Sequence, residues 1–346
     1  MIDVMIDVQR GDCGKGKLSK KLVEAIPFAH GRYDAVAKYN GGGNAGHAVW
    51  IDDIKYTTHY LTSAIYNKKA HVIIGPGCVL NVNEFLKEYE KFDKIFSLSG
   101  RVFVHPYTHI ITDQHIDMDD KDNKIGTTKK GIGPAYADKY ARTGIRAESI
   151  SELNGFLLQN HNNLLDTYQD ILMEGSQGWW LDIDWGNYPY VTSSHIHPGF
   201  AFTTFGIPLY FLRTVYGVCK IYETYVGSNE ELLTCDENHA NIIREIGKEY
   251  GETTGRPRKI GYLDMDKLIE AISSTGVNRL LVNKCDVLEE AKIFKILFNT
   301  PTKKIRSYNS INDMKGDIQA YLLKYCKTIK TIVFSSDKEG KDIGSF

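Results

Sequence analysis

Short apolar runs alternate with glycine-rich polar loops along most of this chain. Runs rich in Val, Ile, Leu and Met predict strands at residues 1–8, 33–38, 71–75, 103–104, 171–173, 215–222, 279–282 and 329–334. Apolar residues at helical spacing predict helices at residues 18–23, 83–92, 138–142, 150–168, 240–250 and 263–272. Strands separated by helices are typical of a parallel sheet with helices on its faces. We therefore predict an α/β fold in one large domain, residues 1–346, with a mostly parallel central sheet and small antiparallel subdomains such as a hairpin turning at residues 52–53.

The composition narrows the class of protein. With 346 residues, 42% hydrophobic and 25% charged, the chain is an ordinary globular protein with enough length for a large core. The net charge of −1 predicts no nucleic-acid or membrane partner, and no apolar stretch approaches the roughly 20 residues of a membrane span. Six scattered cysteines without a C-x-x-C pair, and no secretory leader, predict reduced thiols in a cytoplasmic protein without a zinc site.

The first glycine-rich loop, Gln9–Lys17, follows the first strand and precedes a helix. This P-loop-NTPase-like layout presents backbone N–H groups and a helix N-terminus to phosphate, although the spacing is not that of a Walker motif. Lys15 and Lys17 add positive charge, whereas Asp12 would repel phosphate unless it binds Mg²⁺ or moves a proton. The alternative is a glycine-rich surface turn with solvated lysines.

Three further polar loops follow predicted strands or lead into helices. They are Asn40–His47, Gly126–Tyr136 and Glu174–Gly178. Because ligands collect at the carboxyl ends of parallel strands, we expect these loops to meet at one site. His47 is then a candidate catalytic imidazole, with a structural role as the alternative.

Two later stretches suggest specific ligands. Arg256 and Arg258, in the stretch Thr253–Lys259, could hold a small dicarboxylate through bidentate hydrogen bonds, or could be a solvated basic loop. Asn283–Asp286 ends a predicted strand and resembles the guanine-reading Asn-Lys-x-Asp motif, in which an ionised Asp accepts two guanine N–H groups.

Together these stretches resemble the adenylosuccinate synthetase family. The matching segments occur in family order over about residues 1–290: Gly11–Lys17, Asn44–His47, Ile125–Tyr136, Glu174–Gly178, Leu181–Ser194, Thr253–Arg258 and Lys284–Asp286. The resemblance implies a ligase of purine biosynthesis that joins IMP and L-aspartate at the expense of GTP, with Mg²⁺ as cofactor. The γ-phosphate would move to O6 of IMP, and the aspartate amine would then attack C6.

The resemblance also implies roles for individual residues. The catalytic residues would be Asp12, His47 and Lys15, with Asp12 and the Gly46 carbonyl holding Mg²⁺. IMP would contact Asn44, Ala45, Thr128, Arg142, Gln177, Thr192 and Arg256, with Arg142 reaching a neighbouring subunit of a homodimer. Aspartate would contact Thr253, Thr254, Gly255, Arg256 and Arg258. GTP would contact Gly11, Asp12, Cys13, Gly14, Lys15, Gly16, Lys17, Gly46, His47, Arg258, Lys284, Cys285, Asp286 and Ser335.

Some positions depart from the family pattern. Arg10 and Cys13 stand where the family usually has Trp and Glu, and Tyr225 stands where it has Arg. The loop that covers guanine is altered to Phe334–Asp337. Two alternatives therefore stay open: the related viral branch, which aminates dGMP with ATP or GTP, and a GTP-binding regulatory protein. Asp12 favours the IMP reaction, because some members of the viral branch lack this carboxylate.

Overall fold

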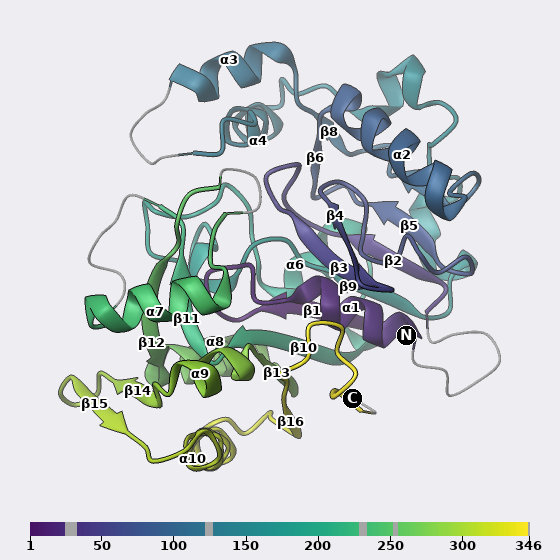
Figure 1. Ribbon diagram of the computed structural model, residues 1–346. Coiled ribbons are helices and arrows are strands. Elements are labelled where there is room, and N and C mark those ends of the chain that lie inside the picture. The colour runs from purple at the N-terminus through teal and green to yellow at the C-terminus, as the bar shows by residue number, and fades with distance from the viewer. Residues whose placement is uncertain (25–32, 122–126, 228–233, 252–254, 345–346) are drawn as a thin grey trace.

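The computed structural model describes residues 1–24, 33–121, 127–227, 234–251 and 255–344. Its centre is an eight-stranded sheet in the order β16-β13-β10-β1-β9-β2-β5-β7, and every neighbouring pair is parallel (Figure 1). In chain order these strands are β1 (Ile2–Asp7), β2 (Ala35–Lys38), β5 (His71–Ile74), β7 (Val102–Val104), β9 (Ile171–Glu174), β10 (Leu212–Lys220), β13 (Arg279–Asn283) and β16 (Thr331–Phe334). The predicted parallel sheet is confirmed.

Three smaller sheets surround it. One combines β11 (Tyr222–Tyr225), β12 (Lys259–Asp264), β14 (Lys295–Phe298) and β15 (Lys304–Ser307), with antiparallel pairs at both ends. The others are the hairpin β3 (His47–Ile51) and β4 (Ile54–Thr58), which turns at residues 52–53 as predicted, and the pair β6 (Val79–Leu80) and β8 (His109–Ile110).

Helices cover both faces of the central sheet. They are α1 (Lys15–Glu24), α2 (Val82–Phe96), α3 (Asp113–Lys121), α4 (Ile132–Ala141), α5 (Leu164–Thr167), α6 (Pro198–Phe205), α7 (Glu237–Gly247), α8 (Met265–Thr275), α9 (Cys285–Ala291) and α10 (Ile311–Tyr325). In the described part of the chain, no helix has the length and apolar character that crossing a membrane requires.

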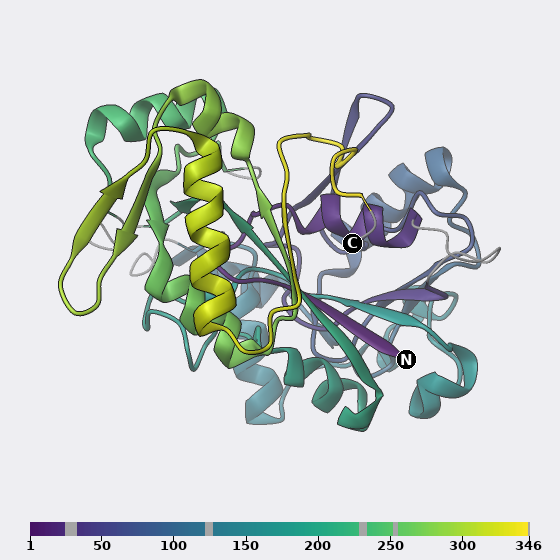
Figure 2. The same ribbon diagram turned by 90° about the horizontal axis from the view of Figure 1, so that it is seen from below.

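The burial of β1 explains why four of its six residues are apolar. All six residues are buried, with Ile2, Val4 and Ile6 in one hydrophobic cluster and Met5 in another, and Asp3 and Asp7 are the charged exceptions. A strand inside a parallel sheet is covered on both faces, so apolar side chains occur on both faces of the strand. The last described residues run beside α1 (Figures 1 and 2), where Ile343 joins the cluster of Leu18 and Leu22.

The prediction of one helix over residues 150–168 is wrong. That segment contains 3-10 turns at Ser151–Leu153 and His161–Asn163, and one short helix, α5. Gly155 interrupts the pattern, and Asn160 adopts a left-handed conformation with φ 53°, which asparagine tolerates better than most residues. The helix predicted at residues 138–142 in fact begins at Ile132, because Gly131, with φ 70°, supplies the turn before it.

Candidate active site

The loops at the carboxyl ends of β1, β2 and β9 surround a cavity of about 730 Å³. Further walls come from the N-terminal part of α4, from residues after β11 and from the segment that precedes β12. The predicted site residues in its wall are Gly11, Asp12, Lys15, Asn44, Ala45, Gly46, His47, Thr128, Gln177, Thr192, Arg256 and Arg258. Four of the predicted polar segments therefore meet at one edge of the sheet.

Asp7, at the end of β1, shapes the first loop. Its buried carboxylate accepts hydrogen bonds from the backbone N–H groups of Gln9 (2.9 Å), Gly11 (3.3 Å) and Cys13 (3.0 Å) and lies 3.7 Å from Nζ of Lys15. A carboxylate that organises backbone donors fixes the loop before any ligand arrives. Asp7 was not among the residues assigned from the sequence, although a charged residue inside an apolar strand was a usable signal.

Gly14 brings the first loop close to β13. Its φ is +97°, and a Cβ atom there would come within 2.7 Å of Nδ2 of Asn283. That nitrogen donates to the carbonyl of Cys13 at 2.6 Å. Both the backbone conformation and the space at this position require glycine.

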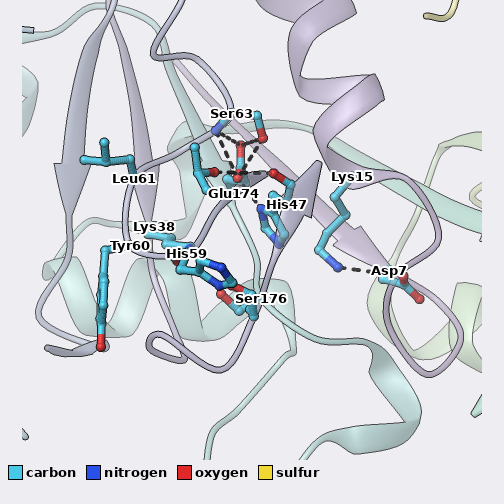
Figure 3. Close-up of polar contacts among 12 residues, drawn as sticks. Asp7, Lys15, Lys38, His47, His59, Tyr60, Leu61, Ser63, Glu174 and Ser176 are labelled. Atoms are coloured by element: carbon cyan, nitrogen blue, oxygen red, sulfur yellow. Dashed lines mark hydrogen bonds and ion pairs between the residues drawn. The ribbon is translucent and has the colours of Figure 1, made fainter. Parts of the chain in front are cut away.

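His47 lies at the start of β3 and points toward Glu174 at the end of β9 (Figure 3). Its Nδ1 is 2.5 Å from Oε1 of Glu174, and the same carboxylate accepts hydrogen bonds from Oγ and the backbone N–H of Ser63. Burial of Glu174 would raise its pKa, but His47 and Lys38 together lower it. The carboxylate is therefore ionised at neutral pH and sets the orientation of the imidazole.

Burial lowers the pKa of His47 to about 4, so its imidazole is neutral at pH 7. With Nδ1–H donating to Glu174, the lone pair of the neutral ring is on Nε2, which is buried and has no hydrogen-bond partner among the described residues. Lys15 lies on the other side of His47 in Figure 3 and donates to the carbonyl of Gln177 at 2.6 Å. In the neutral ring this nitrogen accepts a hydrogen bond from a ligand, and after protonation it can donate one to an anionic ligand.

Amide side chains also line the cavity. Gln177 has φ 56° and donates from Nε2 to Oδ1 of Asn44 at 3.1 Å, while its own Oε1 is buried without a described partner. Asn40 accepts from the backbone N–H of Ser176 at 2.7 Å and holds this loop against β2. Thr128 and Thr192 line the same cavity. Amide and hydroxyl groups can recognise a heterocyclic base or a sugar.

Asp12 and Arg258 face each other in the cavity. One guanidinium nitrogen of Arg258 contacts the Asp12 carboxylate, whose side chain is 42% exposed. Arg256 also lines the cavity, whereas Gly255 lies outside its wall, and Thr253 and Thr254 lie outside the described residues. The two arginines thus lie where a carboxylate-bearing ligand could enter.

Several predicted GTP contacts form a separate group, which we call the outer edge: Lys17, Lys284, Cys285, Asp286 and Ser335. They surround the carboxyl ends of β13 and β16 and are not in the cavity wall, and neither are Cys13, Gly14 and Gly16 of the first loop. Lys17 donates to Oγ of Ser335 at 2.8 Å, and Lys284 donates to the carbonyl of Gly247 at 3.0 Å. Asp286 is exposed.

Arg142 is also outside the cavity. It is exposed and ends α4, with φ 67°. Its side chain therefore extends from the surface of the protein.

Asp12 and Gly46 contribute the oxygen atoms that could hold a metal ion at the cavity. Carboxylate and carbonyl oxygens are the ligands that Mg²⁺ accepts, and the exposure of Asp12 leaves room for water ligands. The acidic side chains of Asp182 and Asp184 lie near His195, but Asp182 already accepts backbone hydrogen bonds from Asp184 (2.9 Å) and Trp185 (3.2 Å). This second group is therefore explained by loop structure.

The comparisons with known proteins agree with this geometry. The family model described as adenylosuccinate synthetase matches residues 4–167 and 158–308. The adenylosuccinate synthetase of Chlorobaculum tepidum is 32% identical over 347 residues, which cover 85% of this chain and 78% of that protein. That of Thermodesulfovibrio yellowstonii is 34% identical over 343 residues, with 85% and 79% covered.

Two solved structures are similar throughout. The fully ligated adenylosuccinate synthetase of Plasmodium falciparum has a TM-score of 0.83 and 26% identity, and the match covers 98% of each chain. The succinoaminodeoxyadenylate synthetase of cyanophage S-2L, bound to dGMP and dATP, has a TM-score of 0.76 over 99% of this chain and 94% of its own, but at 20% identity it supports the fold alone. The chain belongs to the adenylosuccinate synthetase family, and it is a GTP-dependent ligase of purine biosynthesis that joins IMP and aspartate.

Proposed function

We propose that Asp12 and His47 perform the chemistry of this ligase in the cavity at the carboxyl ends of β1, β2 and β9. The observation that supports this is their presence in one cavity wall with Lys15, the amides of Asn44 and Gln177, and two arginines. In the first step, Asp12 takes the N1 proton of IMP, O6 attacks the γ-phosphate of GTP, and the β–γ bond breaks to release GDP. In the second, the neutral amine of aspartate attacks C6 and loses a proton, and phosphate leaves with the former O6.

His47 and Lys15 stabilise the phosphoryl group during its transfer. Nε2 of His47 is unpaired, and an approaching phosphate raises the pKa of the imidazole, because an opposite charge favours the protonated ring. The proton on Nε2 then forms a hydrogen bond to a phosphate oxygen, while Glu174 holds Nδ1. Asp12 and the carbonyl of Gly46 would hold Mg²⁺, which neutralises charge on the triphosphate when bound.

The remaining assignments rest on the family resemblance and, for residues in the cavity wall, on their presence there. We propose that IMP is bound by Asn44, Ala45, Thr128, Gln177, Thr192 and Arg256. We propose that aspartate is bound by Arg258 with residues 253–256, of which Thr253 and Thr254 lie outside the described residues. The outer edge binds guanine: the exposed Asp286 accepts its two N–H donors, and the stem of Lys284 lies along the base.

Arg142 completes the IMP site of a second subunit. Its exposure at the end of α4, outside its own cavity, supports a homodimer in which this guanidinium reaches the neighbour's IMP phosphate. All six cysteines are free thiols, which supports a reducing compartment such as the cytoplasm.

A substrate matrix tests this function. Phosphate release is measured with IMP, dGMP or GMP against GTP or ATP, with and without aspartate. We expect turnover that requires IMP, GTP and aspartate together. Turnover with dGMP would move the protein to the viral type of reaction, and GTP hydrolysis independent of both other substrates would indicate a regulatory GTPase.

A further inference from the structure

Both backbone and side-chain contacts join Glu249 to Arg258. The N–H of Arg258 donates to the carbonyl of Glu249 at 2.9 Å, and Nη1 of Arg258 contacts Oε2 of Glu249. Next to this pair, the N–H of Gly251 donates to the carbonyl of Arg256 at 2.8 Å. Glu249 is therefore the residue against which Arg258 is anchored.

The carboxylate of Glu249 is held by residues from the central sheet and from the four-stranded sheet. Its side chain is fully buried, with Nζ of Lys220 2.8 Å from Oε2 and the hydroxyl of Tyr222 2.6 Å from Oε1. Lys220 ends β10, and Tyr222 begins β11. A buried carboxylate is costly unless it is paired, and this one has two cations and a hydroxyl around it.

Arg258 is shared between two carboxylates. Its terminal nitrogen Nη1 faces Glu249, and its other terminal nitrogen, Nη2, contacts the carboxylate of Asp12. The proposed mechanism needs this carboxylate free to take a proton and to bind Mg²⁺. The guanidinium of Arg258 interacts with two carboxylates at once. Its interaction with Asp12 is therefore weaker than it would be if Glu249 were absent.

We propose that Glu249, supported by Tyr222, is a positioning residue that holds one terminal guanidinium nitrogen of Arg258, Nη1. The other terminal nitrogen, Nη2, then releases Asp12 to Mg²⁺ and stays directed at aspartate. This inference rests on the proposed roles of Asp12 and Arg258. Glu249 is outside the cavity wall and touches no substrate.

The first test is Glu249→Gln, which keeps the shape and removes the charge. Arg258 then pairs more fully with Asp12. We expect about tenfold increases in the Mg²⁺ concentration for half-maximal activity and in the KM for aspartate, with kcat changed less than threefold. A folded variant with wild-type values for both would overturn the proposal.

The second test covers the case in which Glu249→Gln does not fold, since it leaves Lys220 and Arg258 without a buried counter-charge. Tyr222→Phe removes one hydrogen bond to Glu249 and no charge, and we expect a two- to fivefold shift of the same two parameters. Tyr168→Phe is the matched control, because it removes another buried hydroxyl, which contacts His71 at 2.9 Å in a different part of the protein. Equal, unchanged values for both tyrosine variants would contradict the proposal.

Calorimetric titration of Mg²⁺ in the presence of GTP separates this inference from the proposed function. A wild-type protein that makes no adenylosuccinate would refute the function. The inference about Glu249 would still be supported if Mg²⁺ binds about tenfold more weakly to Glu249→Gln, or two- to fivefold more weakly to Tyr222→Phe, than to wild type. Unchanged Mg²⁺ affinity in both variants would contradict it.

Discussion

The cavity wall and the outer edge differ in how their polar groups are satisfied. In the cavity wall, Nε2 of His47, Oε1 of Gln177 and Nε of Arg258 are buried without partners among the described residues. At the outer edge, Lys17 and Ser335 bond to each other, and Ser335 also donates to Asp342 at 2.7 Å. An unpaired buried polar group costs free energy, so each of these three atoms in the cavity wall is a place where a ligand atom can bind.

This contrast suggests different binding behaviour for the two regions. The cavity wall presents its groups already oriented, for example by Glu174 and Asn40. The outer edge must exchange internal contacts for contacts to the nucleotide. Burial lowers the pKa of Lys17 to about 8, and the segment after β16 contacts this half-buried lysine through Ser335 and the carbonyl of Asp337. Changes in the cavity wall should therefore affect chemistry, and changes at the outer edge should affect nucleotide affinity.

Removing a reacting group should have the largest effect. Asp12→Asn and His47→Gln should each lower kcat by about 10²–10⁴-fold, the usual contribution of a positioned acid or base, with little loss of stability for the exposed Asp12. Steady-state kinetics with IMP, GTP and aspartate, beside circular dichroism, provide the measurement. Near-normal kcat in either variant would show that the cavity wall is not the reaction site.

Glu174→Gln should have the next largest effect. The neutral amide no longer favours the ring orientation with Nδ1–H toward residue 174, and it does not stabilise the imidazolium that forms beside phosphate. We expect a 10–100-fold lower kcat with KM values for GTP and aspartate within threefold. Ser63→Ala, which removes one hydroxyl from the same carboxylate, is the milder control. An equal loss in both variants would argue that packing around Glu174 matters more than its charge.

Asp286→Asn should change nucleotide choice instead of chemistry. The amide replaces one carboxylate acceptor with a donor, so guanine loses its paired acceptor. We expect the KM for GTP to rise about tenfold or more, the GTP-to-ATP preference to fall by the same factor, and kcat at saturating GTP to stay within threefold. If the wild type and the variant use GTP and ATP alike, the outer edge does not read guanine.

A feature of the fold or of the site could be predicted from the sequence where it depends on residues that are close together in the chain. The strands and the glycine loops were recognisable because burial and backbone geometry leave a direct mark, as at Gly14. The partners of the site residues were harder to recognise. The contact between Glu174 and His47 forms only because segments 127 residues apart in sequence lie side by side. Asp7 and Glu249 contact residues near them in sequence, but the sequence does not show that their carboxylates are buried against the loop or against Arg258. The helix predicted at residues 150–168 failed for a related reason, because leucine spacing alone does not reveal turns at Gly155 and Asn160.

The smallest expected effect concerns stability and pH. The pKa of His47 falls from about 6.5 in the unfolded chain to about 4 in the fold, so between these values the unfolded chain binds more protons. Stability therefore rises with pH in this window and is lost as pH falls from about 6.5 toward 4. Per group, the slope approaches ~1.4 kcal/mol per pH unit when one state is fully protonated and the other is not. Urea unfolding at pH 5 and pH 6 should show a slope about 1 kcal/mol per pH unit smaller in His47→Gln than in the wild type. Parallel curves would mean that folding does not shift the pKa of this imidazole, and His47 would then be largely protonated in the free protein at pH 5.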